Sequence, residues 1–379
     1  MKGCAVLAGI ALTTVASAQP EQWLEYHTSP EGKGYRYLEL TTNAPVGVAL
    51  PKLNPQPYFA RWPTPLDPAG GRWLCLERTR KSGLWDHLYI DSNGNGRLDD
   101  EAPAEAANRD QYSAYFGPVR VVFQSEDGPV AYHLVFRFMK YSDNSVNLLA
   151  SSGGWYEGMV SLAGKKRRVQ LVDANANGAF NDLASDPAGA DRIVVEGEKA
   201  GEQFLGRLLE VDGQLFRIEA ARDGAFVKVT KAEGVALGQV RVPEAISEFT
   251  AVGENGQFLR KPDKGGFTLP VGKYQVHGWI SNRKDDKGAA WKLSGYNFPA
   301  SATFEVAAGK PAPLEVGEPI RAGFEAAEST NRVTFSLHLR GSLNESVEMQ
   351  RGNQRPRAPR LFLASRDGSY HYTNNFTYG

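Results

Sequence analysis

Short apolar or alternating runs recur along the whole chain, whereas long helical patterns are scarce. The runs are rich in Val, Phe, Tyr and Leu, and Gly, Asp, Asn and Pro separate them, which is the pattern of strands joined by turns. The sequence therefore predicts an all-β fold of antiparallel sheets. The predicted strands are 35–40, 46–50, 73–77, 84–90, 119–123, 131–138, 155–162, 169–172, 208–211, 215–218, 226–229, 239–242, 249–252, 302–306, 333–339 and 361–364.

Two segments depart from this pattern. Residues 101–109 are alanine-rich and acidic, and we predict a short helix there. Residues 51–68 are rich in proline, which fixes φ and disfavours the helical region for the residue before it. This connection is therefore expected to be extended or to contain turns.

Hairpin signals become explicit in the middle of the chain. Asp212-Gly213 and Asp223-Gly224 each separate two alternating runs, and Asn255-Gly256 does the same further on. Glycine readily adopts the positive φ that a tight hairpin turn requires. Antiparallel pairing is predicted around all three turns.

The composition loosens at residues 231–238, where we place a domain boundary. Residues 19–232 form the first region, which divides into two subdomains near residue 110 in one interpretation. Residues 233–379 form the second region. The chain ends on an aromatic segment, so either 376–378 is a closing strand or this module is incomplete at its C-terminus.

The segment 269–276 reads L-P-x-G-x-Y-x-V. Proline and the following glycine suit a tight turn between two strands. The segment resembles the strand-turn-strand signature of prealbumin-like and carboxypeptidase-regulatory-like modules. This resemblance implies a β-sandwich in the second region.

The motif D-x-N-x-N-G occurs twice, starting at Asp91 and at Asp173. Each copy directly follows an apolar, strand-like run. An internal duplication is one explanation, although the flanking residues match poorly. The alternative to a binding site is that both segments are simple hairpin turns, which use the same residue types.

Calcium binds six to eight oxygen ligands, so a loop that supplies them must wrap tightly. Alternate positions 1, 3 and 5 can direct side chains inward, glycine at position 6 permits the sharp bend, and position 7 contributes its carbonyl. Acidic or amide residues at positions 9 to 11 are candidates to close each site. The first candidate set is Asp91, Asn93, Asn95, the Arg97 carbonyl, Asp99, Asp100 and Glu101, and the second is Asp173, Asn175, Asn177, the Ala179 carbonyl, Asn181 and Asp182.

These segments resemble EF-hand loops and their shorter relatives in secreted proteins, the dockerin and thrombospondin-type repeats. An EF-hand loop has a bidentate Glu at position 12, but this chain has Ala102 and Ala184 there. No strong helical pattern precedes either loop. We therefore expect strand-to-loop Ca²⁺ sites that stabilise the fold, not an opening switch. The first loop has more acids, so we expect it to bind more tightly, with both in the weak range of about 10⁻⁴ to 10⁻³ M.

The N-terminus has the features of a cleavable signal peptide. A basic start at Lys2 precedes an apolar run over 5–15, and Ala16-Ser17-Ala18 is a small-residue cleavage site. We therefore predict a signal peptide over 1–18 and a secreted or periplasmic protein. No stretch approaches the roughly 20 apolar residues of a membrane span.

The charge balance indicates no particular class of binding partner, and the cysteine content excludes an intramolecular disulfide. The chain has 43 basic and 43 acidic residues, so net charge indicates neither a nucleic acid nor an anionic membrane as partner. After removal of the signal peptide only Cys75 remains, in an apolar run, and we expect it in the core. No intramolecular disulfide can form.

No recognised catalytic or zinc-ligand motif occurs, and the six histidines are scattered. Paired carboxylates on distant strands would leave no motif, so a carbohydrate-active hydrolase remains an alternative. A basic loop contains Arg351, Arg355, Arg357 and Arg360; a solvated loop is the favoured interpretation, and contact with an acidic glycan is the other. The main prediction is a calcium-binding β-protein with a structural role or a protein or glycan ligand, and the alternative is a glycan hydrolase or glycan-binding protein.

Overall fold

The computed structural model describes residues 20–80, 83–125, 128–142, 145–199, 201–352 and 354–377. No helix occurs among these residues, so none is present that could span a membrane. The all-β prediction is confirmed. The predicted signal peptide over 1–18 lies outside the described residues.

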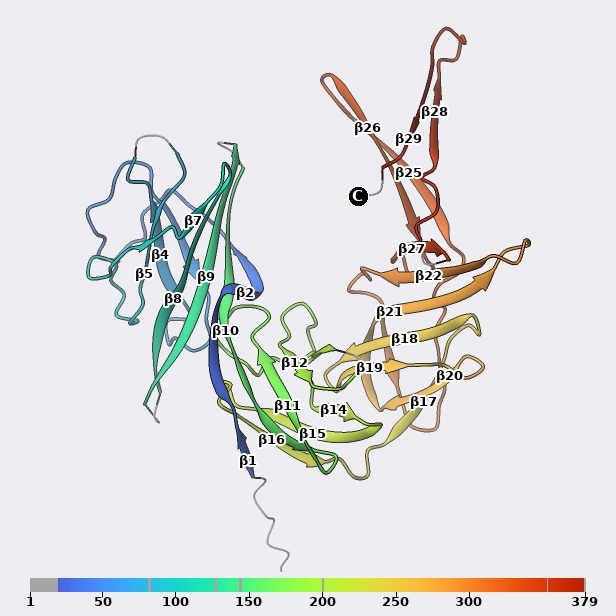
Figure 1. Cartoon of the computed structure of the whole chain (residues 1–379), viewed down its shortest axis with the longest axis horizontal. Coiled ribbons are helices and arrows are strands. Elements are labelled where there is room, and N and C mark those ends of the chain that lie inside the picture. Colours follow the sequence, from blue (N-terminus) through green and yellow to red (C-terminus); the bar gives the residue numbers. More distant parts are fainter. Residues whose placement is uncertain are drawn as a thin grey trace, which may run out of the picture.

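The first half of the chain is built on a long antiparallel sheet of eight strands (Figure 1). Its order is β13-β12-β11-β10-β9-β8-β7, and β2 pairs with the long central strand β10. The alternating burial of β9 and β11 shows one face directed to the core. The strands are β2 (Glu25–Leu38), β7 (Asn108–Arg109), β8 (Ser113–Ser125), β9 (Gly128–Ser142), β10 (Ser145–Leu162), β11 (Lys165–Val172), β12 (Arg192–Val195) and β13 (Glu202–Phe204).

Two four-stranded sheets accompany this large sheet. One has the order β3-β4-β5-β6 and the other the order β1-β16-β15-β14, which in Figure 1 lies between the two halves of the molecule. The first comprises β3 (Tyr58–Trp62), β4 (Arg72–Glu77), β5 (His87–Ile90) and β6 (Ala104–Glu105), and the second comprises β1 (Glu21–Trp23), β14 (Leu208–Val211), β15 (Gln214–Ala220) and β16 (Phe226–Lys231).

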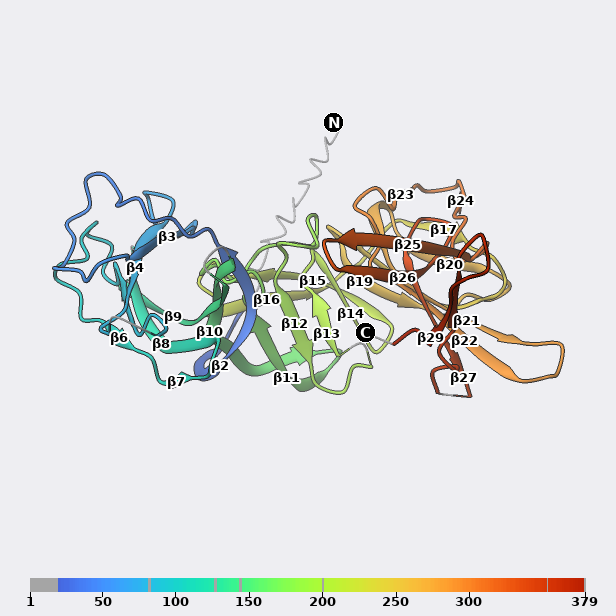
Figure 2. The ribbon, with the colours of Figure 1, turned by 90° about the horizontal axis from the view of Figure 1, so that it is seen from above.

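The second half contains another eight-stranded sheet, a three-stranded sheet and a separate hairpin (Figure 2). The large sheet has the order β19-β18-β21-β22-β27-β26-β25, with β23 on β21, and the small one has the order β20-β17-β24. The strands are β17 (Leu237–Arg241), β18 (Ile246–Gly253), β19 (Gly256–Arg260), β20 (Gly266–Pro270), β21 (Gly272–Lys284), β22 (Ala290–Tyr296), β23 (Thr303–Val306), β24 (Ala312–Pro313), β25 (Arg321–Ser329), β26 (Arg332–Arg340), β27 (Ser346–Arg351), β28 (Arg360–Ala364) and β29 (His371–Asn375).

Two large hydrophobic clusters form the cores. The first draws on the sheets of the first half and is rich in aromatic rings; Trp62 stacks on Tyr132 with ring centroids 5.8 Å apart. The second contains Phe249 and Trp279, together with Leu208 from β14. Most residues of the first cluster precede residue 232 in the sequence, and most residues of the second follow it. The domain boundaries themselves stay a prediction. Cys75 is buried and free, as expected.

The structure corrects two local predictions. Residues 101–109 form no helix; they contain the two-residue strands β6 and β7, because Ala104 pairs with Leu88 and Asn108 with Tyr115. Residues 46–50 form no strand, since only Ala49 makes an isolated bridge, to Arg97. Pairing with distant segments therefore decides both regions, against their local composition. Residues 376 and 377 follow the last strand, β29, and do not form one.

Candidate metal centre

The first loop begins where β5 ends. The carboxylate of Asp91 is 5% exposed and accepts backbone N–H bonds from inside its own loop. Its Oδ1 accepts from Gly94 at 2.7 Å and from Asn95 at 3.0 Å, and its Oδ2 accepts from Gly96 at 2.9 Å. Gly96 adopts a φ of 78°, which a residue with a side chain rarely adopts. The loop therefore wraps around its first carboxylate.

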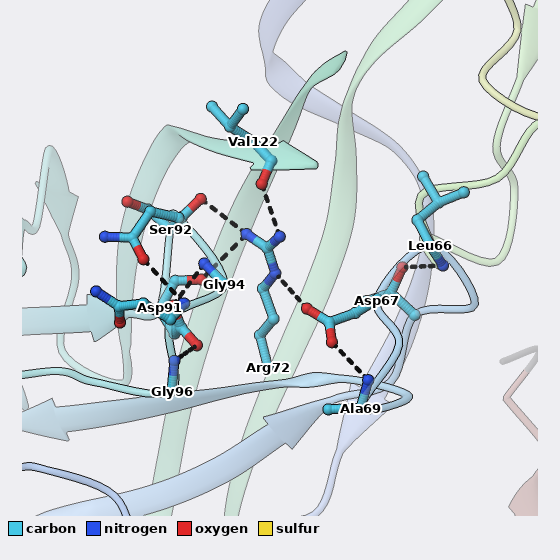
Figure 3. A network of polar contacts seen from close by, with 12 residues as sticks. Leu66, Asp67, Ala69, Arg72, Asp91, Ser92, Gly94, Gly96 and Val122 are labelled. Carbon is cyan, nitrogen blue, oxygen red and sulfur yellow. Dashed lines mark hydrogen bonds and ion pairs between the residues drawn. The ribbon is translucent and has the colours of Figure 1, made fainter. Parts of the chain in front are cut away.

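An arginine from β4 holds this loop in place (Figure 3). The Arg72 guanidinium donates to the carbonyls of Ser92 at 2.7 Å and Val122 at 2.6 Å, and to the carboxylate of Asp67 at 3.0 Å. A Cβ added to Gly94 would lie 2.9 Å from one of its nitrogens. Because Arg72 is only 3% exposed, these bonds form away from water. Protein contacts thus fix the position of the first loop.

The acids that follow the first loop have different partners. Asp99 pairs with Arg97 at 2.7 Å. Glu101 accepts from the backbone N–H and the hydroxyl of Ser92, at 2.6 and 2.7 Å. The carboxylate of Asp100 contacts one of the Asn side chains that define the motif, since it accepts from Asn95 Nδ2 at 2.7 Å.

The second loop repeats these bonds in a buried setting. Asp173, at the end of β11, is fully buried and accepts from the N–H of Asn177 at 3.2 Å and of Gly178 at 2.7 Å. Asp182 Oδ2 accepts from Asn177 Nδ2 at 2.7 Å, which matches the bond between Asp100 and Asn95. Of the positions proposed to close each site, the structure therefore brings position 10 to the motif in both loops. Asn181, at position 9, is exposed.

Aromatic residues of the core attach the second loop to the rest of the protein. The hydroxyl of Tyr132 donates to Asp173 Oδ2 at 2.7 Å, and Trp62 Nε1 donates to the carbonyl of Ala176 at 2.7 Å. Ala176 has a φ of 51°, at the position that Gly94 occupies in the first loop. A left-handed alanine costs of order 1 kcal/mol, which the surrounding contacts must offset.

A third carboxylate, Asp191, joins the second loop from outside the motif. It is fully buried and accepts from the N–H of Asp182 at 2.8 Å and of Ala174 at 3.2 Å. Glu101 bonds to the corresponding N–H of Ser92 in the first loop. No sequence signal identifies Asp191, because it lies outside the motif and immediately precedes β12.

Burial controls the charge of the second loop. Desolvation raises the pKa of Asp173 to about 6, and burial together with the neighbouring Asp173 carboxylate raises the pKa of Asp191 well above its usual value. Neither of these carboxylates, nor Asp182, forms an ion pair within the described residues. The second loop thus gathers three carboxyl groups that form no ion pair among the described residues, while the charge of the adjacent Arg192 interacts with Asp191.

Asn175, at position 3, adds a buried amide oxygen to the second loop. Its side chain is 9% exposed, and its Nδ2 donates to Asp182 Oδ2 at 3.0 Å and to the carbonyl of Gly189. Its Oδ1 is buried and has no hydrogen-bond partner. Burial of an oxygen that accepts no hydrogen bond destabilises the folded state unless a cation binds to that oxygen.

The donor set is one of carboxylate, amide and carbonyl oxygens. The described residues contain no group of three or more His, Cys, Asp or Glu side chains able to hold a metal ion by themselves. A cation in the second loop would therefore also require the Asn175 and Asn177 oxygens and the carbonyl of Ala179. Such hard, mixed oxygen donors fit Ca²⁺ better than a transition metal.

Comparison with known proteins adds no further evidence on these loops. The chain matches no protein-family model. Searches of curated proteins and of solved structures also find no match.

Proposed function

We propose that this chain is a secreted, calcium-binding β-protein in which the cation stabilises strand-to-loop turns. The observation that carries the proposal is the buried, unpartnered Oδ1 of Asn175 in the same loop as the buried carboxylate of Asp173. A cation bound there would supply both with the positive partner they lack. The carboxylate of Asp182 and the Ala179 carbonyl would complete the protein ligands.

The two loops are not equally suited to this role. By number of acids in the sequence, the first loop should bind more tightly. In the structure, however, Arg97 engages Asp99 and Ser92 engages Glu101, whereas the second loop gains Asp191. Burial also weakens competition by water, because charges interact more strongly at low dielectric. We propose that the second loop is the tighter Ca²⁺ site.

The proposed role is structural support, with binding of a ligand elsewhere on the protein. The loops follow the strands β5 and β11, and no helix among the described residues flanks either of them. Alanine occupies position 12 of both, so neither has the bidentate Glu of a calcium sensor. Cation binding at one to ten times Kd would stabilise the fold by about 0.4 to 1.4 kcal/mol.

Thermal unfolding with Ca²⁺ and with EDTA tests the proposal. We expect a higher Tm in Ca²⁺, and the Asp173→Asn variant should lose most of this difference. The matched Asp91→Asn variant should retain most of it. A Tm that does not change between Ca²⁺ and EDTA would refute calcium binding, and a loss confined to Asp91→Asn would reassign the main site to the first loop.

The extracytoplasmic location is proposed from the predicted signal peptide over 1–18. Extracellular calcium is abundant enough for sites of the weak class. The N-terminal sequence of the exported protein tests this location. We expect it to begin at Gln19, and a protein that retains Met1 in the cytoplasm would contradict the proposal.

A further inference from the structure

A large cleft lies in the C-terminal part of the molecule, away from the two calcium-type loops. It has a volume of about 1210 Å³ and is lined by β26, by β27 and by the hairpin of β28 and β29. In Figure 1 this hairpin extends next to β25 and β26, which form one end of the second large sheet. Small-molecule pockets usually measure about 300 to 1,000 Å³, so the cleft has room for an oligomeric ligand.

Exposed aromatic rings line the cleft. The side chains of Tyr296, Tyr370 and Tyr372 are 45%, 56% and 42% exposed. Tyr372 lies on β29 and Tyr370 directly precedes it, so the alternation of an extended chain directs both rings to the same side. Phe376, four residues after Tyr372, also lines the cleft. These rings offer flat apolar faces to a bound molecule.

The charged groups of the cleft are mainly basic. Its only lining carboxylate among the described residues is that of Glu348, which pairs with Arg355 at 3.1 Å. Arg340 donates to the Ser346 hydroxyl at 2.9 Å and has no carboxylate partner within the described residues. Arg357 is exposed and forms no hydrogen bond or ion pair there. The cleft therefore has an excess of positive charge available to an anion.

Neutral polar groups are interspersed among these residues. Ser336 and Thr334 of β26 and Asn374 and Asn375 of β29 are among the residues that line the cleft. Hydroxyl and amide groups both donate and accept hydrogen bonds. They suit a ligand that has many hydroxyl groups as well as negative charge.

We propose that this cleft binds an acidic oligosaccharide, a chain of sugar rings that carry carboxylate or sulfate groups. Sugar rings would pack on the tyrosine faces, their anionic groups would pair with Arg340 and Arg357, and their hydroxyl groups would bond to the Ser, Thr and Asn side chains. Glycoside hydrolysis commonly uses two carboxylates on either side of the scissile bond. Because Glu348 is the one carboxylate that lines the cleft in the part of the chain that the structure describes, the cleft is assigned to binding and not to cleavage.

Calorimetric titration of the full mature chain with four probes tests this assignment. The probes are an oligogalacturonate for carboxylated sugars, a heparin oligosaccharide for sulfated sugars, a neutral cello-oligosaccharide of similar length, and polyglutamate for an acidic peptide. We expect one or both anionic sugars to bind, with an affinity that decreases as salt increases. Tighter binding of polyglutamate would assign the cleft to acidic peptides instead, and equal binding of the neutral sugar or no sugar binding at all would also overturn the proposal.

Substitutions locate the site. The double variant Arg340→Gln and Arg357→Gln should weaken binding of the anionic sugar by about tenfold or more, since it removes two charged hydrogen-bond donors. Tyr372→Ala should weaken it as well, by the loss of ring packing. The control removes the same charge outside the cleft, through Arg332→Gln and Arg366→Gln, and should change affinity by less than about twofold. Equal losses in both double variants would show non-specific charge attraction and would refute a site in the cleft.

Discussion

The two D-x-N-x-N-G loops have nearly the same internal hydrogen bonds but opposite surroundings. The first is largely exposed, and the Arg72 guanidinium holds it through backbone carbonyls. The second is buried, and Tyr132, Trp62 and the carboxylate of Asp191 surround it. A motif therefore determines how a loop wraps, whereas its surroundings determine how strongly it needs a cation.

The largest effect on stability is expected from substitution of Arg72, the β4 residue that bonds to the first loop. Arg72→Met removes a charged donor from the Asp67 carboxylate and from the carbonyls of Ser92 and Val122, and should destabilise the protein by about 3 kcal/mol. The measurement is urea unfolding, and the loss should be the same with Ca²⁺ or EDTA. Arg97→Met, which removes an exposed ion pair, is the control and should cost less than about 0.5 kcal/mol. A loss that calcium restores would show that Arg72 acts through a cation site.

Substitution of the acid at position 1 should have a smaller effect on stability, and this effect should differ between Asp173 and Asp91. Asp173→Ala leaves a buried tyrosine hydroxyl and two backbone N–H groups unpaired, whereas water can reach the exposed first loop in Asp91→Ala. We expect Asp173→Ala to cost about 2 kcal/mol more in urea unfolding with Ca²⁺ present. Equal losses would mean that the difference in burial has no energetic consequence.

The pH dependence of stability should distinguish the loops by a further, smaller amount. Because the folded-state pKa of Asp173 is about 6 and its usual value is 3.8, the folded protein binds more protons than the unfolded chain between these values. In EDTA, this group's contribution to stability should be complete below about pH 4 and should be lost as the pH rises towards 6, with a slope of at most about 1.4 kcal/mol per pH unit.

Urea unfolding at several pH values measures this slope. Calcium should reduce it, because the cation favours the ionised carboxylate. Asp173→Asn should abolish this contribution and Asp91→Asn should retain it. The contrary result would be a free energy of unfolding that increases from about pH 4 to 6 in EDTA and that loses this increase in Asp173→Asn. It would contradict the raised pKa of Asp173 in the folded protein.

Local sequence signals predicted the hairpins well. The strand 208–211 and the Asp212-Gly213 turn occur as expected, with φ of 50° and 73° at the two turn residues. The L-P-x-G-x-Y-x-V segment forms the end of β20 and the start of β21. Turn chemistry and alternation are both local, so a single sequence contains them.

Long-range contacts explain what the sequence did not predict. Strand β3 lies within the proline-rich connection, which was predicted to be extended or to contain turns, but its pairing with β4 was not predicted. Residues 101–109 form strands for a similar reason. Arg72, Tyr132 and Asp191 each reach their loop from another part of the chain, so no local pattern identifies them. The motif residues could be predicted, but their burial and partners depend on the assembled sheets.

The contact between Trp62 and Ala176 makes the second loop visible to spectroscopy. The indole is fully buried, donates its N–H to the loop backbone and stacks on Tyr132, the ring that bonds to Asp173. Its emission wavelength and quantum yield therefore depend on the conformation of this one loop, while the first loop has no indole bonded to its backbone among the described residues. The protein thus contains an intrinsic optical reporter at the site where the cation is proposed to bind.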